Sequence, residues 1–208
     1  MKKFLIALMM LASATCSAAT IETAHFNSND ELIYPVVCVE DKAVEQKINT
    51  AIIAEIDRFV TGVYRNAQVN GYEVGGVHTS FDIGSNQAGN TVILSLIITE
   101  SCYYKMAAHP STFQHTLNFN TANGELMNIG YLTEVGEGFR TGELTQRLNE
   151  KLQAKVEREN LFLFPDALPL KELPPDFYWD ENLHVHFIFQ QYAVAPYAVG
   201  IIDVDIDE

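Results

Sequence analysis

Residues 112–126, Thr-Phe-Gln-His-Thr-Leu-Asn-Phe-Asn-Thr-Ala-Asn-Gly-Glu-Leu, decide the fold class. Phe113, His115, Leu117 and Phe119 alternate with polar neighbours, which is the period of a half-buried strand. The Asn-Gly step that follows predicts a turn because it tolerates positive φ, and a further strand continues over 126–129. Strands joined by such short turns pair antiparallel.

The segments before this stretch extend the same sheet. The spacing of apolar residues by three and four predicts one amphipathic helix, which we expect to be broken by residues 66–71. The proline at position 35 favours an edge position for the first strand. The predicted elements are a strand over 31–39, a helix over 43–64, and strands over 72–83 and 91–105.

The segments after it add a second helix and two strands. Apolar residues at every fourth position predict a helix over 141–159, and residues 160–176 hold four of the seven prolines and are expected to be loop. Strands follow over 183–189 and 199–206. The predicted class is therefore α+β, an antiparallel sheet with two amphipathic helices in the order β-α-β-β-β-α-β-β.

The N-terminus has the pattern of a secretory signal. Two lysines precede a short apolar run, and small residues follow up to Ala19. We therefore expect residues 1–19 to be a signal peptide and the protein to be periplasmic or secreted. The alternative is a lipoprotein anchored at Cys16, although Thr15 fits a lipidation motif poorly.

The remainder, 20–208, is expected to be a single domain, with two smaller subregions, about 20–105 and 106–208, as the alternative. No later segment is apolar enough to span a membrane. Cys38 and Cys102 remain after cleavage, and an even count in an exported protein predicts a disulfide between them; two free thiols are the alternative.

The net charge of the chain limits the classes of partner that it can attract. Loss of the two N-terminal lysines leaves 11 basic against 27 acidic residues, a formal charge of −16. Such a field repels nucleic acid and anionic lipid and attracts basic partners.

An ordered series of segments carries a family resemblance. The series is Ile33-Tyr34-Pro35, Lys47-Ile48-Asn49, Leu94-Ser95-Leu96, Tyr103-Tyr104, Ala107-Ala108-His109, residues 117–126, and residues 191–200. Together they resemble the extracytoplasmic domain family shared by the anti-sigma factor RsiV and the peptidoglycan deacetylase PdaC. Two departures are that Ala107 and Ala108 replace glycines typical of the family, and that Pro110 follows the histidine.

The resemblance implies a binding module of the cell envelope. In RsiV the corresponding region captures lysozyme, a small basic enzyme, so we expect a lysozyme-like enzyme or peptidoglycan as the partner. The alternative function is an envelope glycan hydrolase or deacetylase, with metal assistance as one form of it. The sequence favours the non-enzymatic function, with no cofactor, because no nucleophile motif or phosphate-binding loop is present.

The candidate partner-binding residues are His109, Tyr192, Pro196 and Tyr197. Tyrosine beside proline makes a rigid amphipathic contact surface, and tyrosine is enriched at binding hot spots. The alternatives are a histidine that ties down a turn and aromatic side chains that belong to the core.

Two further motifs resemble metal-binding patterns. His184 and His186 have a spacing that suits zinc, and His115 or His109 could complete the site, since two ligands alone do not. Asp203, Asp205 and Asp207 resemble a calcium loop without its glycine and distal glutamate, so we expect them to form the solvated face of a terminal strand. No pair of carboxylates is singled out as catalytic.

Overall fold

The computed structural model describes residues 17–89, 92–135 and 141–207. Its helices are α1 (Lys42–Asn70) and α2 (Thr141–Glu159), with short helical turns at Phe26–Ser28, Tyr131–Val135 and Tyr197–Val199. Its strands are β1 (Thr20–His25), β2 (Ile33–Cys38), β3 (Val74–Asn86), β4 (Ile93–Tyr104), β5 (Ser111–Asn120), β6 (Glu125–Leu126), β7 (Phe177–Trp179), β8 (Val185–Phe189) and β9 (Ile202–Asp205). Most of the predicted signal peptide, including Cys16, lies outside the described residues.

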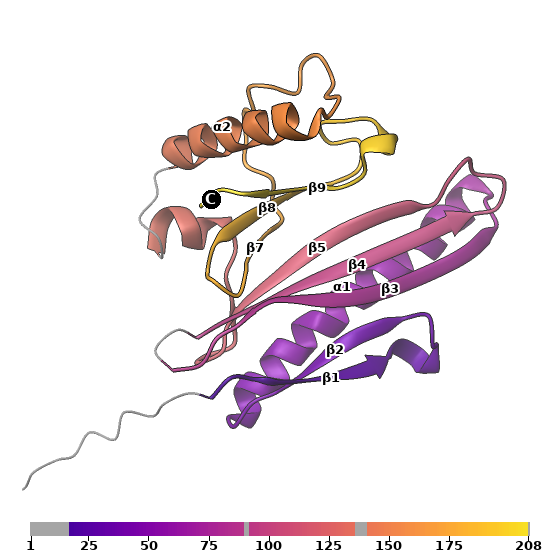
Figure 1. The fold of residues 1–208 in the computed structure, drawn as a ribbon. Helices are drawn as coiled ribbons and strands as arrows, with labels where there is room; N and C mark the ends of the chain where they lie inside the picture. The colour runs from indigo at the N-terminus through magenta and orange to yellow at the C-terminus, as the bar shows by residue number, and fades with distance from the viewer. Residues whose placement is uncertain (1–16, 90–91, 136–140, 208) are drawn as a thin grey trace, which may run out of the picture.

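The α+β class with antiparallel pairing is confirmed. The strands of the described chain form three sheets rather than one, with the orders β1-β2, β3-β4-β5-β6 and β7-β8-β9 (Figure 1). No helix of the described segments is long and apolar enough to cross a membrane.

Helix α1 is longer than the sequence predicts. Asp41 begins it, because its side chain accepts hydrogen bonds from the backbone N–H groups of Ala43 and Val44. The apolar stripe continues to the buried Ala67, so the helix extends through the expected break and ends before Gly71, whose φ of 70° suits a helix C-cap.

Helix α1 covers one face of the long β3–β4–β5 sheet, and the β1–β2 hairpin lies beside it (Figure 1). Apolar side chains, mostly from the helix and from β4 and β5, build the core of this layer. Its buried members are Ala19, Val37, Val44, Ile48, Ile52, Ile56, Leu94, Leu96, Ile98, Leu117 and Phe119.

A second core forms between α2 and the three-stranded sheet, which the helix covers (Figure 1). Leu144, Leu148 and Leu152 form the buried stripe of α2, as their spacing predicts. They belong to the same cluster as Trp179, which is 1% exposed.

Buried hydrogen bonds join the long sheet to β7. The hydroxyl of Ser95 donates to Asn118 Oδ1 at 2.7 Å, and Asn118 Nδ2 donates to the carbonyl of Phe177 at 2.7 Å. The backbone N–H of Trp179 donates to Ser95 Oγ at 3.1 Å. Polar side chains of the long sheet thus satisfy the backbone of β7.

Asn49 fastens α1 to β2 in a similar way. Its side chain accepts from the backbone N–H of Val37 at 2.8 Å and donates to the carbonyl of the same residue at 2.7 Å. One side-chain amide therefore replaces the neighbouring strand that β2 lacks at this position.

We expect Asn49→Ala to lower the free energy of unfolding by about 2 kcal/mol, because two backbone groups of the buried Val37 lose their partner. Urea denaturation measures the change. Thr50→Ala is the matched control, since its exposed hydroxyl donates to the carbonyl of Gln46 within its own helix. Equal effects of the two substitutions would contradict the role given to Asn49.

The predicted disulfide between Cys38 and Cys102 is not formed. Cys38 and Cys102 are both free. Cys38 ends β2 just before α1 begins, whereas Cys102 packs in a cluster with Phe59 and Val63. The helix from Lys42 to Phe59 is about 25 Å long at its regular rise, and a bridge needs Cα atoms within about 7 Å.

Candidate functional site

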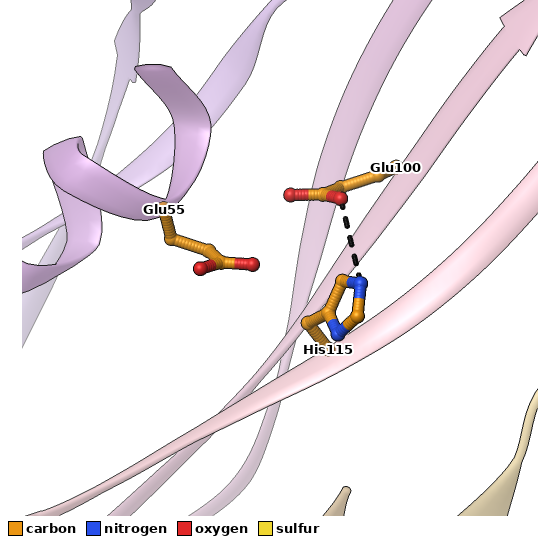
Figure 2. Close-up of side chains that lie close together, drawn as sticks. All are labelled: Glu55, Glu100 and His115. Carbon is orange, nitrogen blue, oxygen red and sulfur yellow. Dashed lines mark ion pairs between the residues drawn. The ribbon is translucent and has the colours of Figure 1, made fainter. Parts of the chain in front are cut away.

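The buried face of the long sheet carries a carboxylate. Glu100 occupies β4 at the position that follows Leu94, Leu96 and Ile98 in the alternation of buried residues, and it is 1% exposed. Its carboxylate points toward α1, where Glu55 points back at it, and His115 of β5 lies beside both (Figure 2). Two strands and one helix thus bring three ionisable side chains together.

The three side chains are close enough to share one ligand. A ligating atom from each of Glu55, Glu100 and His115 lies within 4.8 Å of the other two. His115 Nε2 is 3.7 Å from Glu100 Oε2. Glu100 Oε1 is buried and has no hydrogen-bond partner among the described residues.

Arg58 is the cation that faces these carboxylates. It lies one turn beyond Glu55 on α1 and binds both oxygens of that carboxylate, with Nε donating to Oε2 at 3.1 Å. Its Nη2 is 3.8 Å from Glu100 Oε2. The Arg58 side chain is 57% exposed, so it reaches the carboxylates from the solvent side.

Burial raises the pKa of Glu100 to about 7, and the negative charges of Glu55 and Asp176 act in the same direction. The positive charges of His115 and Arg58 oppose the shift without cancelling it. A buried carboxyl that titrates near neutrality in a cleft is typical of functional sites.

Asp176 fixes the orientation of the His115 ring. Its Nδ1 lies 3.3 Å from Asp176 Oδ1, and this hydrogen bond raises the pKa of the imidazole. Asp176 is itself buried and accepts hydrogen bonds from the backbone of Thr116 and the side chain of Gln190. Nε2 of His115 is therefore turned toward Glu100.

A cavity of about 430 Å³ opens beside this cluster. Glu100, His115 and Arg58 are part of its lining, and Phe59, Val63 and Phe113 contribute apolar walls. A small molecule or an ion can thus approach the buried carboxylate from outside.

The predicted partner-binding residues converge at a second place. The His109 ring stacks on Tyr197 with centroids 3.6 Å apart, and His109 Nε2 is 3.1 Å from the Tyr192 hydroxyl. The Tyr192 and Tyr197 rings lie 6.0 Å apart, and Pro196 directly precedes the turn that carries Tyr197. We call His109, Tyr192, Pro196 and Tyr197 the aromatic surface.

The aromatic surface is open and locally strained. Tyr192 is 55% exposed, and its φ of 65° is unusual for a residue with a side chain. Met106, in the turn that leads to His109, is 98% exposed and has a φ of 72°. Such strain persists where the surroundings hold it and is concentrated at functional sites.

His184 and His186 face the C-terminal aspartates. His184 Nδ1 is 3.1 Å from Asp205 Oδ2, and His186 Nδ1 is 2.9 Å from Asp203 Oδ1. Burial disfavours the charged form of His186, but Asp203 and the other carboxylates outweigh it and raise its pKa. Asp205 Oδ2 is also 3.8 Å from His186 Nε2, but within the described part of the chain no three ligating atoms that include both histidines all lie within 4.8 Å of one another.

The C-terminal aspartates are partly exposed and also bond neighbouring elements of the fold. Tyr178 donates its hydroxyl to Asp203 at 2.6 Å. Asp207 accepts from the backbone of Val185 and pairs with Arg147 at 3.0 Å. The predicted alternation of apolar and acidic residues is present, and the Asp203 side chain is 43% exposed, but the aspartates also hold neighbouring elements.

Sequence reasoning missed Glu100 and Glu55. The signal was present in β4, where Leu94, Leu96 and Ile98 fix the buried face and Glu100 follows on that face. A glutamate in a buried register is rare unless it is paired.

The chain was compared with known proteins. No curated protein matches it. Residues 139–207 match the family model described as "Protein of unknown function (DUF3298)". Two crystal structures of DUF3298 family members have a similar fold. The one from Bacteroides fragilis is 15% identical, with a TM-score of 0.54, over 92% of this chain and 88% of that one. The one from Pseudomonas aeruginosa is 10% identical, with a TM-score of 0.52, over 92% of this chain and 89% of that one.

These matches agree with the resemblance to a domain family of unknown function. At such low identity the two crystal structures bear on the fold alone. The chain therefore has the fold of DUF3298 proteins, and its residues 139–207 match that family.

Proposed function

We propose that this protein is a non-enzymatic binding module of the cell envelope that captures a basic, lysozyme-like enzyme through the aromatic surface. The observation that carries the proposal is the convergence of His109, Tyr192 and Tyr197 from two segments 83 residues apart in sequence. Stacking and hydrogen bonding hold these rings in place before a partner arrives. Preorganised aromatic side chains lose little conformational entropy on binding.

The charge of the chain supports a basic partner. The whole sequence carries 27 acidic and 13 basic residues, a formal charge of −14. Opposite fields raise the rate of encounter and suppress acidic competitors. The resemblance to the RsiV and PdaC domain family supports an enzyme of the lysozyme type as that partner.

The test is titration calorimetry of the purified protein against a c-type lysozyme. We expect saturable one-to-one binding with inhibition of lysis, and weaker binding at physiological salt than at low salt, because the steering charges are screened. An absence of both binding and inhibition would overturn the proposal for lysozyme. Binding to sedimented peptidoglycan instead would identify the wall as the ligand.

Substitution locates the binding site. We expect Tyr192→Ala and Tyr197→Ala each to weaken binding by about thirtyfold, the effect of losing a hot-spot tyrosine of about 2 kcal/mol. Tyr64→Ala is the matched control, because Tyr64 on α1 is 56% exposed against 55% for Tyr192. Equal losses for Tyr64→Ala and Tyr192→Ala would place the site elsewhere.

A second candidate, an envelope glycan hydrolase or deacetylase, is favoured by one observation. Glu100 is a buried carboxyl beside Glu55 in an open cavity, and its raised pKa suits a general acid. Release of reducing sugar or acetate from peptidoglycan, abolished by Glu100→Gln, would make this the better function. Turnover that survives the substitution would remove Glu100 from the chemistry.

A further inference from the structure

We propose that Glu55, Glu100 and His115 form a binding site for a divalent transition metal ion, with zinc as the fitting ion, independently of partner binding. The three side chains offer one imidazole nitrogen and carboxylate oxygens within 4.8 Å of one another. Zinc takes such nitrogen and oxygen ligands in sets of three, with an open fourth position.

The unpartnered oxygen of Glu100 distinguishes this site from an ordinary acidic cluster. The Glu100 side chain is 99% buried, and Oε1 has no hydrogen-bond partner among the described residues. A buried carboxylate oxygen without a partner is costly. Figure 2 shows the Glu100 carboxylate directed into the space that Glu55 and His115 also face, where a cation would satisfy it.

The surroundings of the three ligands suit a metal. Asp176 holds Nδ1 of His115, so Nε2 faces Glu100 with a fixed orientation. A carboxylate behind the histidine is the usual outer partner of a zinc ligand. The cavity of about 430 Å³ beside the cluster provides the route for the ion and the space for a fourth ligand.

Arg58 is the competitor for this position. Its guanidinium neutralises Glu55 and lies 3.8 Å from Glu100, so an ion must displace it. The displacement is feasible because the Arg58 side chain is 57% exposed and can turn into solvent. Zinc and Arg58 thus exclude one another, which gives the proposal a distinctive signature.

The experiment is titration of the full chain, stripped with a chelator, with zinc chloride in a calorimeter. Absorption of the cobalt-substituted protein reports the ligand geometry. We expect one ion per chain, a loss of affinity of at least about tenfold in Glu100→Gln and His115→Gln, and a gain in Arg58→Gln. Magnesium should not compete, because it requires six oxygen ligands.

His186→Asn is the matched control, since it removes the other histidine that is surrounded by carboxylates. Thermal melting tests whether each variant is folded. We expect the Glu100→Gln variant to remain folded, because the substitution removes a buried charge. Zinc binding that is lost in His186→Asn and retained in Glu100→Gln would overturn the assignment. So would a wild-type protein that binds no zinc, or an Arg58→Gln variant with no gain in affinity.

Discussion

Asn118→Ala is expected to lower the free energy of unfolding by about 4 kcal/mol, because two buried polar groups lose their partner at once. The Ser95 hydroxyl loses its acceptor, and the Phe177 carbonyl loses its donor. Asn118 is 2% exposed and Ser95 is 0% exposed, so water cannot replace the missing bonds. The loss would be a large fraction of the stability of an ordinary domain.

Equilibrium unfolding in urea, followed by the fluorescence of Trp179, measures the effect, because this single tryptophan lies at the same junction. Asn120→Ala is the control: it changes the same residue type two positions further along β5, where the side chain accepts a hydrogen bond from the backbone of Ala122 in the adjacent turn. A loss below about 1 kcal/mol for Asn118→Ala would show that packing alone holds β7 on the long sheet.

Strand β5 shows how far the sequence predicts this fold. The alternation of Phe113, His115, Leu117 and Phe119 predicted one buried face, and the strand is where it was expected. The polar residues between them were expected to face solvent. Asn118 is buried instead, because the three-stranded sheet covers the other face, and no local periodicity encodes that packing between distant segments.

The missed strands lack the alternation by which a strand is recognised in a sequence. The pattern of β1 places only two partly buried residues among exposed ones, so its sequence carries little periodicity. All three residues of β7 are buried, so it has no alternation. Helix α2, by contrast, spans the predicted residues, because its apolar face packs on one side only and the periodicity of 3.6 is preserved.

The candidate sites divide in a similar way. From the sequence, the residues of the aromatic surface were predicted separately, and it is the fold that brings His109 within bonding distance of Tyr192 across 83 residues. The Glu100 cluster needs three elements in register, which a single sequence does not reveal. Its signal in the sequence is a charged residue, Glu100, at a position where the alternation of β4 predicts an apolar one. Such departures from a pattern are expected at functional sites.

Glu100→Gln should stabilise the protein at neutral and higher pH, by an amount that grows with pH. Burial raises the pKa of Glu100 to about 7 from its ordinary value of 4.5. Between these values the folded state holds a proton that the unfolded state has lost. The contribution of Glu100 to stability is therefore present below pH 4.5 and is lost as the pH rises to about 7.

Glutamine cannot ionise, so the variant escapes this loss. The difference in unfolding free energy between variant and wild type should increase by about 3 kcal/mol from pH 4 to pH 8, and should then stay constant. The hydrogen bond that His115 donates to Asp176 raises the pKa of His115, as do the charges of Asp176 and Glu100, so the histidine also favours lower pH in the wild type.

Denaturant unfolding across this range, with a chelator present, measures the difference. Glu125→Gln on β6 is the control, because this side chain is exposed and its charge stays in water in both states. A flat difference for Glu100→Gln would mean that Arg58 and His115 already hold Glu100 ionised throughout. A growing difference would mean that the folded protein carries a buried carboxyl with too little positive charge around it, which is the electrostatic condition that a bound cation relieves.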